Sequence, residues 1–452
     1  MSNKTEEYIT RVIEEIRSLD PEQKEFLQSI EEVFRSVSLS LDKNPQYMEN
    51  RILERMSEPE RQIMFRVSWV DDAGKIHINR GYSVLFNGVL GPFKGGLRFH
   101  PTVNLSVIKF LGFEQTYKNA LTGLPIGGGK GGTNFDPRGK SEAEIRRFCA
   151  AFMTELYHYI GSDVGVPAGD IGVGGREIGF LFGTFSRISG TFDNGTITGK
   201  GASYGGSNFR PEATGTGIAY FTNEIMKHHK DTLKGKRIVV SGYGQVAWGT
   251  IKKVAELGGI PLTISGSGGF VHDPEGIITK EKISYIDGIK KISGHSLEDY
   301  AERFGAAFYP GEKPWRISAD VAIPCATQNE IGLEEAALIA GNGTKYVVEG
   351  ANMPCTNDAI KYFQGKGMVV GPAKAANAGG VSVSVMEMSQ NAIKLMLSDK
   401  HMDERLKEIM EHMHQDIFDT CEEYDLGYDL ITGANITAFE RVADTMIRLG
   451  TY

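Results

Sequence analysis

Apolar residues recur with helical spacing at both ends of this chain. Near the N-terminus they stand at i, i+3, i+4 and i+7, at Ile9, Val12, Ile13 and Ile16, which predicts an amphipathic helix over residues 5–20. The same spacing predicts further helices over residues 25–38, 105–119, 212–229 and about 427–452. The two N-terminal helices each present an apolar face that needs a partner, either inside the domain or in another subunit.

Short β-rich runs predict strands in two different arrangements. Residues 62–70 and 76–88 read as strands joined by the turn Asp71-Asp72-Ala73-Gly74, which predicts a hairpin. Later apolar runs are separated by helical stretches, and they lie at about 238–240, 260–265, 320–324, 346–348 and 368–370. Strands that alternate with helices in this way are typical of a parallel, doubly wound sheet.

The length of 452 residues favours two domains. The character of the sequence changes near Arg210-Pro211-Glu212. We therefore expect an α/β protein with two domains around a cleft. Residues 1–204, completed by residues 426–452, would form a substrate-binding and oligomerisation domain, and residues 205–425 a Rossmann-like dinucleotide-binding domain.

Composition excludes several other classes of protein. The net charge of −8 argues against a general nucleic-acid binder. We expect neither a secretory signal nor a membrane span, because the N-terminus has no long apolar core and the chain no apolar run of about eighteen residues. The four cysteines are scattered without CxxC spacing. This predicts neither a zinc site nor a disulfide framework, and it suits a reducing, cytoplasmic location.

A dinucleotide fingerprint, Gly242-x-Gly244-x-x-Ala247, lies between a predicted strand and a predicted helix. The first glycine permits a tight turn, the second lets a pyrophosphate approach the backbone, and the small Ala247 lets the helix pack closely on the strand. An ordinary βα turn is the alternative. The flanking strand, helix and second strand favour the cofactor site.

The end of the second strand bears on which dinucleotide is used. An NAD site commonly has a carboxylate there for the ribose 2′-hydroxyl, but this chain has Ser265-Gly266-Ser267-Gly268-Gly269. Serine hydroxyls could receive a 2′-phosphate, and Lys290 downstream could reach it. We therefore expect NADP, with NAD or both cofactors as the alternative. Lys290 could equally be an ordinary solvated helix residue.

Three lysines stand near or among glycines within about forty residues, at Lys94, Lys118 and Lys130. Glycine lets backbone and ligand come close, so the cluster suggests a pocket for a small dianion. Lys130 could serve as a base if burial and nearby cations lower its pKa, with Asp170 as its proton partner. Each has an ordinary alternative: a solvated loop lysine for Lys130, a turn or cap residue for Asp170, and a helix salt bridge with Glu114 for Lys118.

The chain resembles the small class of hexameric glutamate dehydrogenases from about residue 60 to its end. The resemblance rests on several blocks in one order: GPFKGGLRFHPTVNLSVIKFLGFEQTYKNALT, LPIGGGKGG, FDPRGKSEAEIRRFCAAFMTEL, VPAGDIGVGGREIG, RPEATGTG, PCATQNE, EGANMP and ANAGGVSVS followed by EMSQN. Several blocks in sequence are far more specific than any single motif.

The resemblance implies a role for each matching residue. Lys130 would activate water and Asp170 would handle protons. Lys118 and Gln115 would bind the α-carboxylate, Lys94 and Ser384 the γ-carboxylate, and Gly169 the amino group. Asn377 would lie near both ligands, and the cofactor would be contacted by Thr214, Gly242, Gly244, Gln245, Val246 and Asn352. The family is typically a homohexamer.

The implied reaction is the oxidative deamination of L-glutamate to 2-oxoglutarate and ammonium. Leucine and phenylalanine dehydrogenases share the scaffold, but they need an apolar side-chain pocket, whereas Lys94 and Ser384 match an acidic side chain. A catalytically silent dinucleotide-binding protein is a further alternative, and the retained Lys130 and Asp170 argue against it. The chain departs from the common family pattern at Val385 and Gln245.

Overall fold

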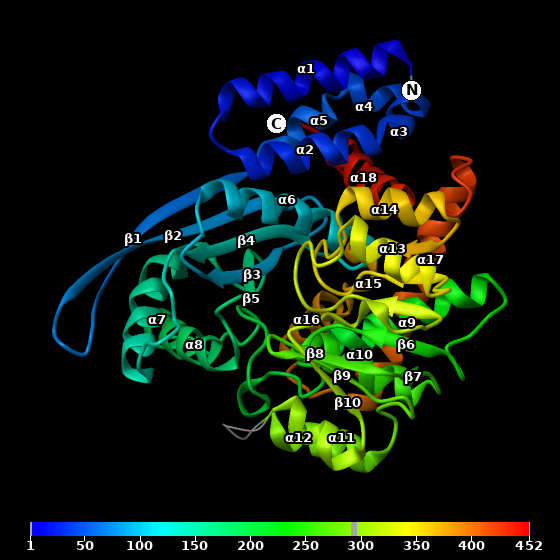
Figure 1. Ribbon diagram of the computed structural model, residues 1–452. Coiled ribbons are helices and arrows are strands. Elements are labelled where there is room, and N and C mark those ends of the chain that lie inside the picture. The colour runs from blue at the N-terminus through cyan, green and yellow to red at the C-terminus, as the bar shows by residue number, and fades with distance from the viewer. Residues whose placement is uncertain (1, 291–295, 452) are drawn as a thin grey trace. The chain divides into compact units, whose positions relative to one another are not determined.

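In the computed structural model, which describes residues 2–290 and 296–451, the chain divides into two α/β units (Figure 1). The first unit comprises Met1–Asn208, Ser384–Met402 and Asn435–Tyr452, and the second comprises Phe209–Val383 and Asp403–Ala434. The expected boundary between the domains was 204/205, with all of residues 205–425 in the second domain. The observed units depart from this expectation chiefly at Ser384–Met402, which belongs to the first unit.

Helices account for the predicted amphipathic segments of the first unit. They are α1 (Asn3–Leu19), α2 (Lys24–Ser36), α3 (Ser38–Lys43), α4 (Pro45–Glu49), α5 (Ile52–Ser57), α6 (Leu105–Leu121), α7 (Glu142–Leu156), α8 (Gly175–Ser189) and most of α18 (Leu430–Leu449). The α1 helix begins where the Ser2 hydroxyl accepts the backbone N–H of Thr5, a typical N-cap. It buries Ile9, Val12 and Ile13, the apolar face that the spacing predicts.

The sheet of the first unit combines a hairpin with three glycine-rich strands. Its strands are β1 (Arg61–Val70), β2 (Ile76–Asn87), β3 (Phe93–Phe99), β4 (Gly127–Thr133) and β5 (Gly165–Gly169), in the spatial order β1-β2-β4-β3-β5. The β1–β2 and β2–β4 pairs are antiparallel, whereas β3 runs parallel to both β4 and β5. Figure 1 shows α6 on one side of this sheet and α7 and α8 on the other.

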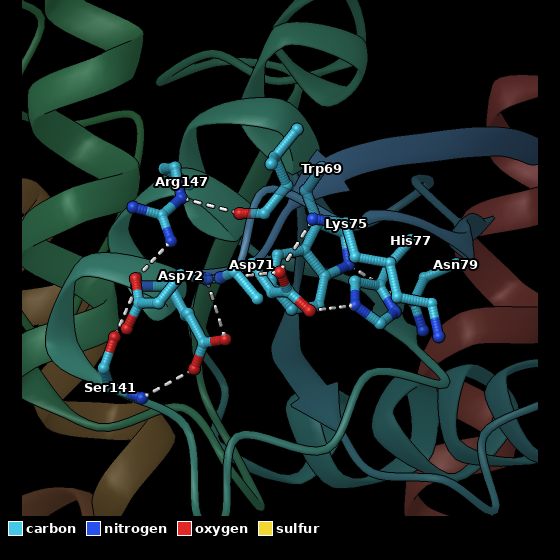
Figure 2. Close-up of polar contacts among 11 residues, drawn as sticks. Trp69, Asp71, Asp72, Lys75, His77, Asn79, Ser141 and Arg147 are labelled. Carbon is cyan, nitrogen blue, oxygen red and sulfur yellow. Dashed lines mark hydrogen bonds and ion pairs between the residues drawn. The ribbon is translucent and has the colours of Figure 1, made fainter.

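The hairpin turn is fixed by carboxylates and by the start of α7 (Figure 2). One oxygen of Asp71 accepts the N–H groups of Ala73 and Lys75, both at 2.9 Å, and the other lies 2.8 Å from Nε2 of His77. Arg147 of α7 pairs with Asp72 and donates to the carbonyl of Val70. The predicted turn therefore forms, and α7 holds it in place.

The second unit has a parallel sheet with the spatial order β13-β12-β11-β6-β7. Its strands are β6 (Arg237–Val240), β7 (Ile260–Pro261), β11 (Val321–Ile323), β12 (Tyr346–Val348) and β13 (Val369–Gly371). All of the pairs are parallel, which confirms the predicted parallel arrangement. A separate antiparallel sheet contains β8 (Thr263–Gly266), β9 (Gly269–His272) and β10 (Ala307–Pro310).

One predicted strand differs from the structure. Residues 260–265 were expected to form a single strand, but β7 ends at Pro261 and β8 begins at Thr263 in the other sheet. The Leu262 N–H still bonds the Ile238 carbonyl at 2.8 Å. Proline cannot donate to a ladder, and Pro261 is the last residue of β7.

Helices lie on both faces of the parallel sheet. They are α9 (Ala213–His228), α10 (Gln245–Glu256), α11 (Lys280–Ile289), α12 (Leu297–Phe304), α13 (Leu333–Gly341), α14 (Asn357–Gly365), α15 (Ala373–Ala376) and most of α17 (Asp399–Glu423). One core cluster joins Val239, Val347 and Val370 of the sheet to side chains of α13 and α14. The fold is therefore a doubly wound α/β layer in this unit.

The helix α16 (Gly379–Ile393) carries the chain from the second unit into the first, with the division after Val383. In the part of the chain that the structure describes, no helix combines the length and apolar character needed to cross a membrane.

Candidate functional site

Three parallel strands bring the predicted substrate residues of the first unit together. In the register of β3 and β4, Lys94 pairs with Gly128 and Leu97 with Gly131. In the register of β3 and β5, Gly96 pairs with Ala168 and Leu97 with Gly169. Lys130 in β4 and Asp170 just beyond β5 therefore lie on either side of β3, and the sheet, not a loop, carries the cluster.

The glycines of these strands are needed because backbone and side chains pack directly against them. A Cβ added at Gly96 would lie 2.8 Å from the Asp170 Cβ and 3.2 Å from Nζ of Lys130. A Cβ at Gly128 would lie 2.0 Å from the Thr116 hydroxyl and 2.5 Å from the Thr116 Cα in α6. The glycine-rich segment Gly127–Thr133 is accordingly a buried strand. The loop-lysine alternative for Lys130 is therefore wrong.

Asp170 is bound by two cations at once. Nζ of Lys130 lies 2.8 Å from one carboxylate oxygen, and Nε of Arg98 lies 2.7 Å from the other. Although burial by itself would raise the pKa of Asp170, the charges of Lys130 and Arg98 outweigh it and hold that pKa well below its ordinary value. The carboxylate is therefore ionised at neutral pH and able to accept hydrogen bonds.

The helix α6 presents the predicted α-carboxylate residues beside these strands. Gln115 and Lys118 are three residues apart on it, and both are half-buried. The Gln115 side chain donates to the Asn119 Oδ1 at 2.7 Å. The fully buried Asn119 amide donates in turn to the carbonyl of Lys94 at 3.0 Å and to that of Gly127 at 2.6 Å. Asn119 thus fixes α6 to the strands on which two of the lysines stand.

Glu114, which stands four residues before Lys118 on α6, is bound by a neighbouring helix. One Glu114 oxygen accepts the Ser29 hydroxyl of α2 at 2.8 Å. Ser384, on α16, is 1% exposed, and Lys94 is also 1% exposed. Both side chains of the predicted γ-carboxylate pair are therefore buried in the first unit.

The dinucleotide fingerprint of the second unit has the expected strand–turn–helix setting. Gly242 follows β6 with φ of +100°, a conformation that favours glycine. Gly244 caps α10, and a Cβ added there would meet nothing within 4 Å. Gln245 is exposed and Val246 half-buried at the first turn of this helix. The residues present therefore leave room for a phosphate at a helix N-terminus.

The segment after the second strand lies against the fingerprint turn. The Ser265 hydroxyl accepts the Gly242 N–H at 2.7 Å, and Ser267 is exposed. Lys290, at the end of α11, donates to the Tyr243 carbonyl at 2.7 Å and lies 4.8 Å from the centre of the Tyr243 ring. Burial lowers the pKa of Lys290 below its ordinary value. Lys290 is therefore anchored at the turn, which rules out the interpretation as a solvated helix residue.

The remaining predicted cofactor residues form a second group in this unit. The Asn377 amide donates to the Asn352 Oδ1 at 2.9 Å and to the Gly350 carbonyl at 3.3 Å. Asn377 is buried and Asn352 is exposed. Thr214 lies in the first turn of α9, half-buried.

Two buried carboxylates near the strand ends were not predicted. Glu330 accepts the Ser241 hydroxyl at 2.9 Å and the Ala326 N–H at 3.0 Å. Glu349 accepts the Ala373 N–H at 3.1 Å, and its burial raises its pKa to about 7. Both hold loops that follow the parallel strands, at the edge where ligands bind in this class of sheet.

Arg98 and Asn119 are the principal site residues that the sequence analysis missed. Both stand inside a quoted block, and Arg98 is four residues from Lys94 on the same strand. Side chains alternate along a strand, so an even spacing places Arg98 and Lys94 on one face. That spacing was the available signal for Arg98. Asn119 gave none, because an asparagine in a helix is usually a solvated residue.

The chain is similar to known dehydrogenases over nearly its whole length. It matches the Glutamate/Leucine/Phenylalanine/Valine dehydrogenase family over residues 205–450, and the dimerisation domain of Glu/Leu/Phe/Val dehydrogenases over residues 59–187. It is 52% identical to the NAD-specific glutamate dehydrogenase of Clostridium symbiosum over 444 residues, which cover 98% of this chain and 99% of that protein.

Relatives with the other cofactor specificity are nearly as similar. The NADP-specific glutamate dehydrogenase of Psychrobacter sp. (strain TAD1) is 48% identical over 446 residues, covering 98% of this chain and 99% of that protein. Among solved structures, the glutamate dehydrogenase of Plasmodium falciparum superimposes with a TM-score of 0.96 at 46% identity, covering 99% of this chain and 96% of that one. The likeness in sequence thus extends to relatives of both specificities.

Proposed function

The chain belongs to the Glu/Leu/Phe/Val dehydrogenase family, and we propose that it acts as a glutamate dehydrogenase with NADP(H) preferred. The reaction converts L-glutamate, NADP⁺ and water reversibly into 2-oxoglutarate, ammonium, NADPH and a proton. As a member of this family the chain is an oxidoreductase acting on the CH–NH2 group, with a nicotinamide dinucleotide as cofactor. The observation that carries the proposal is the Lys130–Asp170 pair among close-packed glycine strands.

The proposed catalytic work is divided between Lys130 and Asp170. A nicotinamide dinucleotide held at the fingerprint turn would supply the acceptor for the hydride of the substrate Cα, and the oxidised substrate would then be hydrolysed. Lys130 orients and activates the attacking water, and the ionised Asp170 accepts and returns protons. The ion pair at 2.8 Å provides a direct route for a proton between the two side chains. The Gly169 carbonyl, next to Asp170, receives the substrate amino group.

Substrate selection is assigned to two buried polar side chains of the first unit. Lys94 and Ser384 bind the γ-carboxylate of glutamate, and each is 1% exposed. A leucine or phenylalanine side chain would leave such a lysine without an anionic ligand, which disfavours the other substrates of the family. Gln115 and Lys118, both on α6, bind the α-carboxylate.

The preference for NADP rests on the serines and lysine beside the fingerprint turn. Gly242, Gly244, Gln245 and Val246 would hold the pyrophosphate side, with Thr214 and Asn352 along the cofactor. Ser265 accepts a backbone bond and keeps its hydroxyl proton for donation. Lys290 adds a cation at the same turn, and the segment Ser265–Gly269 contains no carboxylate that would repel a 2′-phosphate.

We further propose a cytoplasmic homohexamer. The match to a family dimerisation domain over residues 59–187 supports assembly. The hairpin in that range exposes Met64, Ile76 and Ile78 by 60%, 69% and 68%, and exposed apolar groups of this kind mark protein interfaces. Light scattering on the eluting peak of a gel-filtration column measures the mass directly, and a monomer would contradict this part of the proposal.

The deciding experiment measures the near-ultraviolet absorbance of NADPH, and separately of NADH, with 2-oxoglutarate and ammonium. Faster loss with NADPH that requires both other substrates supports the reaction and the cofactor preference together. Faster loss with NADH keeps the reaction and overturns the preference. No loss with either cofactor contradicts the proposal, and trials with the 2-oxo acids of leucine, phenylalanine and valine then identify another amino acid as the substrate.

A further inference from the structure

A fully buried ion pair joins two distant segments of the first unit. Nζ of Lys200 lies 2.7 Å from Oε1 of Glu387, and both side chains are 0% exposed. The residues are 187 positions apart in the chain. Lysine and glutamate are almost never completely buried, because removing both charges from water is costly. A pair in this setting calls for a reason beyond stability.

The pair is part of a clamp that α16 places on the segment 197–206. The Glu387 carboxylate also accepts the Gly199 N–H at 3.0 Å, and Lys200 donates through Nζ to the Ile197 carbonyl. One turn further along, Gln390 donates to the carbonyls of Gly205 and Gly206 at 3.1 and 3.2 Å, and Asn391 donates to Gly205 at 2.7 Å. Positions 387, 390 and 391 have the i, i+3, i+4 spacing of one helix face.

Each side of the clamp leads to a residue of the proposed substrate site. Ser384 lies three residues before Glu387 on α16, which is the same face of the helix. On the other side, the Thr198 N–H bonds the Pro167 carbonyl of β5 at 2.9 Å, and β5 continues directly into Gly169 and Asp170. The pair therefore lies on a continuous connection that runs from Ser384 along α16 to the segment 197–200 and on to β5, the strand that leads to Asp170.

We propose that Glu387 and Lys200 are positioning residues that fix Ser384 relative to Gly169 and Asp170. The inference rests on the proposed function, in which Ser384 binds the γ-carboxylate and Asp170 moves the proton. An apolar pair of similar volume would pack as well, but it would not bind the Gly199 N–H and the Ile197 carbonyl in a fixed register. Directional charged bonds set that register, and small errors in such distances are costly in catalysis.

The test separates positioning from stability. Glu387→Gln leaves Lys200 buried without its anion, so both the thermal midpoint and the substrate affinity fall. The double variant Lys200→Met/Glu387→Leu removes both charges and recovers much of the thermal midpoint. Its KM for glutamate nevertheless stays raised, by roughly tenfold to a hundredfold, while its KM for the dinucleotide is unchanged. If the double variant recovered both its thermal midpoint and the wild-type KM for glutamate, the proposal would be overturned.

Two further variants keep the result decisive. Glu387→Asp retains the charge but shortens the side chain by one methylene, and it should raise the KM for glutamate even if the double variant does not fold. The matched control is Lys109→Met, which breaks the pair between the 1% exposed Lys109 of α6 and Asp20 in the same unit. It should lower the thermal midpoint and leave the KM for glutamate unchanged.

The wild-type protein is assayed first with glutamate and each dinucleotide, so that the two proposals can fail separately. An inactive wild type contradicts the proposed function. An active wild type whose Glu387→Asp and double variants behave like Lys109→Met contradicts only the positioning role.

Discussion

Glycine does opposite work in the two units of this protein. In β3 and β4 of the first unit, glycine removes side chains so that backbone packs on backbone: a Cβ at Gly95 would lie 1.7 Å from the Gly129 carbonyl oxygen. At the fingerprint turn of the second unit, a Cβ at Gly244 would meet nothing within 4 Å. The first kind of glycine brings charged side chains together, and the second leaves space for a ligand.

The charged side chains near the two sites also differ between the units, in what each of them binds. In the first unit, Lys130, Arg98 and Asp170 form a compact group with two cations on one carboxylate. In the second unit, Lys290 is held against a backbone carbonyl and an aromatic ring. This contrast predicts that changes in the first unit act on turnover and changes in the second on dinucleotide affinity.

The largest expected effect tests whether turnover depends on the first unit. Lys130→Ala should lower kcat by roughly 10²–10⁴-fold, the usual contribution of a general acid or base. The dissociation constant of NADPH, measured by its fluorescence, should stay nearly unchanged. The exposed hairpin lysine variant Lys75→Ala serves as the control and should behave as wild type. Retained turnover in Lys130→Ala would show that the assigned role is wrong.

The comparison of the glycines is tested directly by two alanine variants. A Cβ at Gly128 would lie 2.5 Å from the Thr116 Cα, so Gly128→Ala forces α6 to move. We expect the variant to lose about 1–3 kcal/mol of stability. It should also bind 2-oxoglutarate more weakly, because Gln115 and Lys118 are displaced with the helix. Gly244→Ala should leave the thermal midpoint nearly intact and raise the KM for the dinucleotide. Differential scanning calorimetry measures the thermal midpoint of each variant, and initial rates measure its KM values. Equal thermal midpoints for Gly128→Ala and Gly244→Ala would contradict the difference proposed between the two kinds of glycine.

A smaller effect concerns pH. Since Arg98 helps to hold the pKa of Asp170 low, Arg98→Gln should raise that pKa and move the acidic limb of the kcat/KM profile to higher pH. The ionised Asp170 stabilises the fold above the ordinary carboxyl pKa, and this contribution is lost as the pH falls. In the variant this contribution is smaller, and its loss is complete at a higher pH than in the wild type.

The control for this prediction is Arg138→Gln, which breaks an exposed pair with Asp136. Its pH profile should match that of the wild type. If the acidic limb of Arg98→Gln stayed at the wild-type pH while kcat fell, Arg98 would have a structural role only and would not set the pKa of Asp170.

The smallest expected effect sharpens the description of the second unit. Ser267→Asp places a carboxylate in the exposed segment after β8, and repulsion should raise the KM for NADPH by about tenfold more than the KM for NADH. The control Ser267→Asn introduces a side chain of the same shape as aspartate but without its charge. It should change the KM values for NADPH and NADH little. An equal effect of Ser267→Asp on both dinucleotides would exclude a phosphate site there.

The sequence predicted best those elements that bury a periodic apolar face. The helix around Ile9 and the hairpin with its Asp71–Gly74 turn form where expected, and so do the parallel strands of the second unit except at residues 260–265, which divide between two sheets. The sequence analysis did not assign β3, β4 and β5, because a strand made largely of glycine has no alternation of apolar and polar residues to detect. The same reason made Lys130 read as a possible loop residue.

By itself, the sequence determined the family, the fingerprint turn and the residue types of the site, because each is a local pattern or a run of matching residues. Only the tertiary structure decided that Asp170 is bound by Arg98 as well as Lys130, that Asn119 fixes the Lys94 strand, and that Lys200 meets Glu387 across 187 positions. Such partners are chosen by strand register and by the direction of helix faces. A one-dimensional pattern does not contain these distances, which the packed backbone sets.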